Sequence, residues 1–492
     1  MFRKWNLTLL LVFFIGAGSA AIAAESASEL LEKGINTEET VGDLPKAIEI
    51  YQKVVAEAKT TEAYGAEAQY RLGQCLLKQK KDDEAMAAFQ KLIEKYPDQK
   101  DWVAKAKKHV PGQAEIKFEK VPWKDGEYMQ MGVRLGGGMK IGTFIWSVES
   151  AKLDGKDIWR MKTHRFILSG GDNRGLSQVD ADKNTFQPIK SIFRHTLMGN
   201  TEAEYTPGEV VVTTFKNDKK TSSRKEQLEK VYYDNEQWSE GFRRLPWSKG
   251  YKVTAPVYVP FGGGKIDLPI EVAGIETIES PAGKFECYKL QLGIVNQTFW
   301  ISTDDNRFFV KVEAGGVTGE LEQVGINKPG EIKSYKNDEW GFSFSAPAGW
   351  YFYEQNKSEK NDSSGVYLLD PEETAVNFIG VWKVKNDKAE EDKADAKKAV
   401  RAFADEGVAA RIKELKDYKV RSDSWKEFTI AGLPAVSLIG DYLVGKQKKT
   451  DYSVHVLGQT TKSQLRISSC DPDKLDDLRA EFDKIIETLK IK

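Results

Sequence analysis

Four histidines are the residues of this chain best suited to bind a metal ion or to act as a general base. They are His109, His164, His195 and His455. No two lie close enough in sequence to chelate an ion from one helix or turn, and His-Glu-x-x-His is absent, so a site would need them to converge across the fold. We expect surface or strand-face side chains and predict no metal.

A short acidic run imitates a calcium-binding loop. Asp180, Asp182 and Asn184 have the spacing of its first ligands, but Thr185 replaces the glycine and Ser191 replaces the closing glutamate. Asp and Asn side chains also close turns by accepting hydrogen bonds from the backbone that follows them. The sequence therefore predicts a turn between two strands.

Glycine-rich runs and an acidic pair are the remaining candidates for chemistry. Gly136-Gly137-Gly138 and Gly262-Gly263-Gly264-Lys265 lack the spacing of a phosphate-binding loop, and turns between strands need such glycines. Asp304 and Asp305 are adjacent, so on a strand they would point to opposite faces. The Gly-x-Ser-x-Gly motif of hydrolases is also absent. We predict no catalytic, cofactor-binding or metal-binding residue, and no cofactor.

Cysteine and aromatic side chains have both structural and functional interpretations. Cys75, Cys287 and Cys470 are far apart and form no Cys-x-x-Cys pair, so we expect three buried thiols and no disulfide framework. The middle of the chain is rich in large rings, which suit either core packing, our expectation, or an apolar pocket for a lipid-like ligand. These rings belong to Trp146, Trp159, Phe166, Phe186, Phe193, Trp238 and Trp247.

The composition predicts a multidomain globular protein. A chain of 492 residues is too long for one core and suggests about three domains. Charged residues make up 30% of the chain but nearly cancel, to a net charge of −1, so nucleic acid or an anionic membrane surface is not an expected partner. Aromatic residues, at 11%, supply apolar surface for ordered cores.

The N-terminus has the pattern of a secretory signal peptide. Arg3 and Lys4 precede an apolar run over residues 7–15, and small residues then lead to Ala24 and Glu25, at one of which the mature chain should begin. The apolar run is shorter than the roughly 18 residues of a membrane anchor, and no later segment is apolar enough to cross. We expect residues 1–24 to be a signal peptide and the mature bacterial protein to be periplasmic or secreted.

Residues 25–112 are predicted to form helical hairpins. In the segment 66–99, Leu72-Gly73, Ala85, Phe89 and Pro97 have the spacing of a tetratricopeptide repeat, which this segment resembles. Glycine lets the two helices approach closely, alanine and phenylalanine interlock between them, and proline ends the second helix. The resemblance implies contact with a protein partner.

A second helical hairpin is expected upstream. Residues 47–55 align with residues 85–93, and residues 28–35 would form the first helix of that repeat. Gln69 and Leu76 depart from the tryptophan and tyrosine that the repeat usually has at these positions. Because about three repeats are needed for independent stability, this module should lean on a neighbour or a partner.

Residues 113–330 are predicted to form a β-rich domain. A helix is expected at residues 224–232, and Asp304-Asp305-Asn306 marks a hairpin. Many short strands in sequence order predict an antiparallel sheet that curls or closes into a barrel. Clear strand-like runs lie at residues 143–148, 210–214, 288–292 and 298–301.

This β-rich region resembles a family of exported bacterial β-domains that is known only as a domain of unknown function. The resemblance implies a fold and an envelope location, and no established chemistry. It is carried by Gly132–Thr143, Val179–Pro188, Leu245–Tyr251, Ala273–Tyr288 and Trp300–Asp305.

Residues 331–492 are predicted to form an α/β/α sandwich. The motif Phe-Ser-x-Pro-x-x-Trp at residues 344–350, the step Gly432-Leu433-Pro434-Ala435 and a closing amphipathic helix from Leu475 to Leu489 resemble PsbP, an extrinsic subunit of photosystem II, and its bacterial relatives. A charged helix is expected over residues 389–416. The resemblance implies a binding or assembly module and no catalysis.

These features favour an exported cell-envelope binding or assembly protein, with helical repeats for protein contacts and a β-domain that holds an apolar ligand. An exported hydrolase with an unrecognised site is the alternative. A pocket holding His164 or His195 beside carboxylates would favour the hydrolase, and an apolar cavity or a helical groove would favour binding.

Overall fold

The computed structural model describes residues 26–57, 62–107, 109, 116–136, 138–168, 173–216, 219–293, 295–354, 363–383 and 395–491. It divides into two compact units, residues 1–114 and residues 115–492, called here the helical unit and the β-rich unit. The expected signal peptide, residues 1–24, lies outside the described residues. Within those residues, no helix is both long and apolar enough to cross a membrane.

The helical unit consists of hairpins in sequence order. Ser26 begins the first helix with a capping box, in which its hydroxyl accepts from the Glu29 backbone and the Glu29 carboxylate accepts from Ser26. The helices are α1 (Ala27–Asn36), the π-helical turn η1 (Thr37–Val41), α2 (Leu44–Glu57), α3 (Glu62–Lys78), α4 (Asp82–Lys95) and α5 (Lys100–Lys107).

Each hairpin of the helical unit packs a glycine against an aromatic ring. A Cβ atom on Gly73 would lie 2.6 Å from the ring of Phe89, and one on Gly34 would lie 2.6 Å from the ring of Tyr51. Phe89 and Ala85 are fully buried between α3 and α4. The helices therefore approach as the sequence predicted, and the upstream hairpin repeats the same contact.

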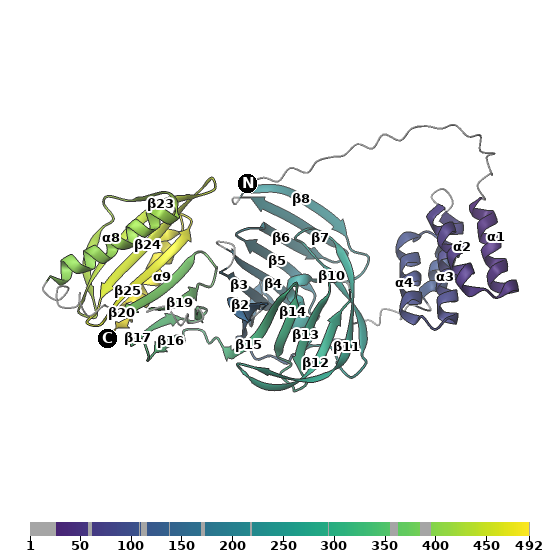
Figure 1. Cartoon of the computed structure of the whole chain (residues 1–492), viewed down its shortest axis with the longest axis horizontal. Helices are drawn as coiled ribbons and strands as arrows, with labels where there is room; N and C mark the ends of the chain where they lie inside the picture. Colours follow the sequence, from purple (N-terminus) through teal and green to yellow (C-terminus); the bar gives the residue numbers. More distant parts are fainter. Residues whose placement is uncertain are drawn as a thin grey trace, which may run out of the picture. The chain divides into compact units, whose positions relative to one another are not determined.

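The β-rich unit is built on one 15-stranded sheet, which curls strongly (Figure 1). Its order along the sheet is β8 to β1 and then β15 to β9, so nearly all neighbours are consecutive in sequence and antiparallel. The strands are β1 (Glu127–Leu135), β2 (Met139–Leu153), β3 (Lys156–Ile167), β4 (Asn173–Asp182), β5 (Pro188–His195), β6 (Gly199–Thr206), β7 (Glu209–Lys216), β8 (Lys219–Gln227), β9 (Tyr233–Asp234), β10 (Lys252–Tyr258), β11 (Lys265–Ser280), β12 (Gly283–Leu292), β13 (Gln297–Ser302), β14 (Phe309–Ala314) and β15 (Val317–Ile326).

The sheet does not close, so the barrel alternative is wrong. Its edges are β8 and the two-residue strand β9, which do not pair with each other. Side chains bring the two ends together instead. Arg224 donates to the Pro260 carbonyl at 2.7 Å, and the Tyr258 hydroxyl donates to Glu226 at 2.8 Å. Because the edge strand β8 is charged and largely exposed, it resists a further backbone ladder.

The helix expected at residues 224–232 is also wrong. Residues 219–227 form β8, which pairs with β7. The helix lies later, as the 3₁₀ turn η2 (Asn235–Gln237) and α6 (Trp238–Arg243), where Asp234 caps the first turn through the Glu236 backbone. Backbone pairing with β7 overrides the helix propensity of the charged side chains in β8.

The short helix α6 fills the inside of the curl. Trp238 and Phe242 pack with buried residues from both halves of the sheet, including Met129 on β1 and Leu290 on β12. The aromatic residues considered for an apolar pocket are core residues here. Trp159, Phe186, Trp238 and Trp247 belong to this core, Trp146 packs against it, Phe166 lies in a second cluster, and Phe193 stacks on His195.

The elements after residue 330 form two smaller sheets flanked by helices. One sheet has the order β16-β17-β26, and the other has the order β18-β19-β20-β25-β24-β23-β21, with β22 paired to β23. The elements are β16 (Ile332–Asn337), β17 (Phe342–Pro347), β18 (Tyr351–Glu354), β19 (Ser363–Leu369), β20 (Val376–Lys383), α8 (Ala396–Glu414), β21 (Lys416–Val420), β22 (Lys426–Ile430), β23 (Leu433–Val444), β24 (Gln447–Leu457), β25 (Thr461–Cys470), α9 (Leu475–Glu487) and β26 (Lys490–Ile491).

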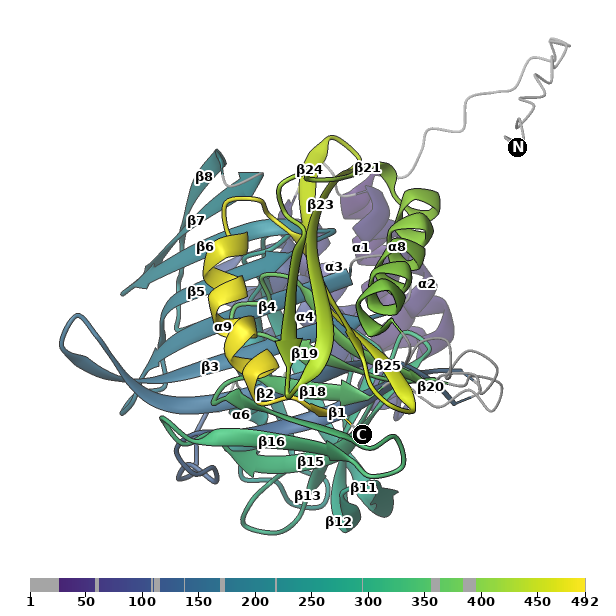
Figure 2. The same cartoon turned by 90° about the vertical axis from the view of Figure 1, so that its left-hand side faces the viewer.

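Helices α8 and α9 cover opposite faces of the eight-stranded sheet (Figure 2). On β23, Val436 and Leu438 pack with α8, whereas Ala435 packs with the core that contains α9. Side chains alternate along a strand, so neighbouring residues serve the two helices. The closing helix was predicted at its observed place, and residues 389–394 of the expected charged helix lie outside the described residues.

Candidate functional site

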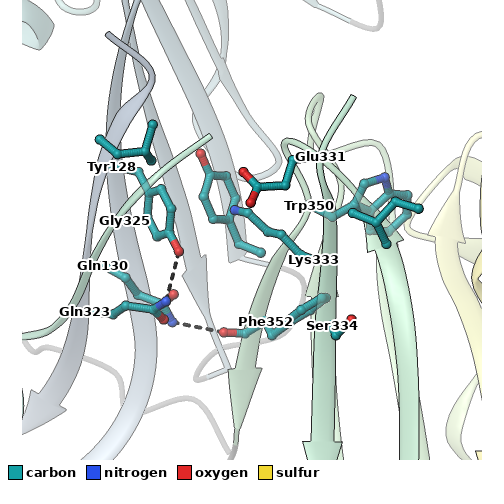
Figure 3. A pocket seen from close by; sticks show the side chains of 12 residues that line it. Tyr128, Gln130, Gln323, Gly325, Glu331, Lys333, Ser334, Trp350 and Phe352 are labelled. Carbon is teal, nitrogen blue, oxygen red and sulfur yellow. Dashed lines mark hydrogen bonds between the residues drawn. The ribbon is translucent and has the colours of Figure 1, made fainter. Parts of the chain in front are cut away.

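A cavity of about 330 Å³ lies within the β-rich unit, where β1 and β15 of the large sheet face β16 and β18 (Figure 3). Strand alternation explains the supply of side chains from β1. Met129 and Met131 point to the inner core of the curled sheet, so Tyr128 and Gln130 are left on its other face, at the cavity. The cavity thus combines side chains from distant parts of the chain.

Lys333 on β16 is the cation of this cavity. Its Nζ atom lies 4.2 Å from the centroid of the Tyr128 ring and 4.3 Å from that of Tyr351. This atom is buried, and no hydrogen-bond acceptor in the described part of the chain reaches it. Burial lowers the pKa of Lys333 to about 8, although the charge of Glu331 opposes the shift. Lys333 therefore remains mostly protonated at neutral pH.

The two tyrosines that flank Lys333 are fixed by amide side chains. The Tyr128 hydroxyl accepts from Gln323 at 2.9 Å, and the Tyr351 hydroxyl accepts from Asn327 at 2.7 Å. The rings meet edge to face, with centroids 5.2 Å apart. Burial raises the pKa of Tyr351 to about 12, so its hydroxyl is neutral at physiological pH. The two rings that flank the cation are therefore held by hydrogen bonds, and the Tyr351 hydroxyl carries no charge.

His164 lies behind Tyr351, with ring centroids 5.2 Å apart. Its Nδ1 atom is 3.0 Å from Oε1 of Glu373, and both side chains are buried. Burial, reinforced by the positive charges of Lys162, Arg165 and Lys333, lowers the pKa of His164 to about 3. A neutral imidazole therefore donates to the Glu373 carboxylate, and the contact ties the large sheet to the elements after residue 330. His164 does not line the cavity.

The other three histidines lie in separate surroundings. His195 on β5 accepts from the Leu197 backbone at 3.1 Å through Nδ1. His455 on β24 is buried beside Gln464, and burial lowers its pKa to about 3. His109 stacks on Phe89 with centroids 4.6 Å apart. His164, His195 and His455 are buried residues of strands. The expected position on a strand face is therefore right for these three, and the expected position on the surface is wrong for them.

The acidic run is a turn, as predicted. Asp182 at the end of β4 accepts from the backbones of Asn184 and Thr185, at 3.0 and 2.8 Å. Asp180 receives two hydrogen bonds from Arg160, at 2.8 and 2.9 Å. Within the described ranges, no group of three His, Cys, Asp or Glu side chains is placed to hold a metal ion.

The glycine run at residues 262–264 and the three cysteines have structural roles. Gly262, Gly263 and Gly264 turn the chain between β10 and β11 with φ angles of 87°, 68° and 153°, which glycine adopts without strain. The three cysteines are buried and unpaired. Burial raises the pKa of each thiol to about 12, so they behave as small apolar side chains, as expected.

Lys333, Tyr128 and Tyr351 were not predicted as site residues. No local pattern distinguishes them, because a strand lysine and two strand tyrosines are ordinary in a β-rich chain. The hydrogen bond from Gln130 to the Phe352 carbonyl, 3.0 Å long, joins residues 222 positions apart. Only the folded chain brings such residues together.

Comparisons with known families cover two parts of the chain. Residues 128–322 match a family described as a protein of unknown function, DUF3108, and residues 67–98 match the tetratricopeptide repeat. The predicted repeat and the predicted β-domain resemblance are thereby confirmed over these ranges. No curated protein matches the chain.

Several solved structures match parts of this chain at low similarity. The solution structure of cyanobacterial PsbP from Synechocystis has a TM-score of 0.27 and 16% identity over 34% of this chain and 95% of its own. LpqN, involved in cell envelope biogenesis of Mycobacterium tuberculosis, has a TM-score of 0.22 and 16% identity over 34% of this chain and 86% of its own. A Bacteroides fragilis protein described as a putative exported protein with a YmcC-like fold has a TM-score of 0.21 and 10% identity over 43% of this chain and 99% of its own.

Proposed function

We propose that this chain is an exported cell-envelope binding or assembly protein whose helical unit contacts a protein partner. The observation that carries the proposal is the repeated hairpin, in which Gly34 against Tyr51 and Gly73 against Phe89 fix two helix pairs in the same way. Stacked helical hairpins present extended surfaces that commonly bind peptides or proteins.

The surface of the helical unit suits such a contact. Tyr70 and Trp102 are half-buried, with ring centroids 5.4 Å apart, and Gln74 lies one turn beyond Tyr70 on α3. Aromatic rings with a polar edge are enriched at protein interfaces, because they bury large areas and still offer hydrogen bonds. The apolar ligand expected in the β-domain is not part of the proposal, since α6 occupies the inside of the curled sheet.

The export part of the proposal is tested on the native protein. The basic, apolar and small-residue order of residues 1–24 predicts cleavage before Ala24 or Glu25. N-terminal sequencing of protein from the periplasm or the culture fluid should begin at one of these residues. Protein that begins at Met1 and is recovered from the cytoplasm would contradict export.

The partner is tested by photocrosslinking in cells. A photoreactive amino acid replaces Tyr64, an exposed residue of α3, and a matched variant carries it at Lys446, an exposed turn residue between β23 and β24. We expect discrete crosslinked products from position 64 and not from position 446. Crosslinks from position 446 alone, or from neither position, would contradict a partner at the helical unit.

A further inference from the structure

We propose that the cavity around Lys333 binds a small molecule that carries one carboxylate group, with Lys333 as its charge partner. The inference goes beyond the proposed function, because it concerns the β-rich unit and needs no partner of the helical unit.

The first argument is the unsatisfied ammonium group. It carries three hydrogen-bond donors, yet its buried nitrogen finds no acceptor among the described residues. The faces of Tyr128 and Tyr351 attract the positive charge, but they offer no oxygen. Holding a cation away from water without an acceptor is unfavourable. A ligand that brings an oxygen anion into the cavity would satisfy the ammonium group once that group turns from the two rings towards the cavity.

The second argument is that the neighbouring amide groups and the Ser334 hydroxyl already have partners. The amide of Gln323 donates to Tyr128, and the amide of Gln130 donates to the Phe352 carbonyl. The Ser334 hydroxyl lies 3.1 Å from that of Ser345, in a hydrogen bond. The charged group of a ligand therefore has its strongest complement at Lys333 (Figure 3).

The third argument concerns the class of anion. Lys333 supplies a single positive charge, and the exposed carboxylate of Glu331 is near enough to act on it. That negative charge disfavours a dianion such as phosphate more than it disfavours a carboxylate. Tyr128, Tyr351 and Phe352 contribute apolar walls to the cavity. Its volume of about 330 Å³ is at the small end of the range for ligand sites, roughly 300–1,000 Å³.

The test is isothermal titration calorimetry of the mature chain with three probes: benzoate, uncharged benzamide of the same shape, and inorganic phosphate. We expect benzoate to bind, and to bind about tenfold to hundredfold more weakly to Lys333→Met, which lacks the charge-assisted hydrogen bond. Benzamide and phosphate should bind more weakly than benzoate. The affinity for benzoate should also fall as pH rises through about 8, where Lys333 loses its proton.

A matched control is Lys336→Met, which removes an exposed lysine from the same strand. It should bind benzoate like the parent. Thermal unfolding separates a ligand site from a structural clamp. Lys333→Met should melt at or above the parent temperature if Lys333 is a poorly satisfied cation, and below it if the cation stabilises the two tyrosines. The proposal is overturned if the parent does not bind benzoate, if Lys333→Met binds benzoate as tightly as the parent does, or if the parent binds phosphate as tightly as benzoate. A lower melting temperature of Lys333→Met than of the parent would also overturn it.

Discussion

Glu38 and Lys333 are both charged side chains held away from water, and they differ in what surrounds them. Glu38 accepts from Tyr51 and Lys78, each at 2.7 Å, and Arg71 lies 3.4 Å away. Burial alone would raise the pKa of Glu38, but these partners outweigh burial and lower it. The ammonium group of Lys333 instead lies against two aromatic rings, those of Tyr128 and Tyr351. Glu38 is thus stabilised by folding, whereas protonated Lys333 is not.

This difference makes the stability of the β-rich unit depend on pH above neutrality. Burial lowers the pKa of Lys333 from the ordinary 10.5 to about 8, so between these values the unfolded chain holds a proton that the folded chain has released. The free energy of unfolding then rises with pH over this window. Lys333→Met lacks the contribution, so the parent should gain stability relative to the variant as pH rises from 8 to 10.5. Urea unfolding, followed by tryptophan fluorescence at both ends of the window, measures the difference. A parallel response of both proteins would contradict it.

At the scale of elements, the helical hairpins could be predicted because their signals are local. Gly73, Ala85 and Phe89 follow one another within two helices, and each is placed by its neighbours three or four positions away. The expected segments 28–35 and 47–55 fall inside α1 and α2. The packing of the two helices could therefore be predicted from the sequence of the repeat alone.

Strand β8 could not be predicted in the same way. Residues 224–232 contain Arg, Lys, Glu, Gln and Leu, which favour a helix when taken alone. In the folded chain, Val212 on β7 is the register partner of Arg224, and this backbone ladder decides the conformation. The alternation in β8 is weak because the strand is an exposed edge, so it carries no signal of period two.

The local packing of the repeat gives a prediction for Ala85→Glu. Ala85 is fully buried between α3 and α4, so an unpaired carboxylate there should lower the free energy of unfolding of the helical unit by about 3–5 kcal/mol. Ala87 is exposed on the same helix, and Ala87→Glu is the matched control with a small effect. Far-UV circular dichroism during heating reports the helices, and tryptophan fluorescence reports mainly the β-rich unit. A helical transition in Ala85→Glu at the parent temperature would contradict the packing.

At the scale of the whole β-rich unit, the elements after residue 330 are joined to the large sheet by contacts that no sequence pattern announced. Tyr128, Ile145 and Phe166 from the large sheet share one apolar cluster with Tyr351 and Tyr353 from β18. The curled sheet, its hairpins and the closing helix follow from local alternation and turns. The candidate site does not, because it forms only where these two layers meet.

The buried pair His164 and Glu373 is the polar centre of that joint, and it gives the last prediction. Removing either side chain leaves the other buried without this partner, so His164→Ala and Glu373→Ala should each lower the free energy of unfolding by about 1–3 kcal/mol. The double variant should lose less than the sum, because the second change removes a group that has already lost this one contact. Glu372→Ala is the matched control. Glu372 is largely exposed in its ion pairs with Lys162 and Arg194, so its loss should change stability by at most about 1 kcal/mol. Urea unfolding of the four variants and the parent measures the coupling, and strictly additive losses would show that His164 and Glu373 do not act as a pair.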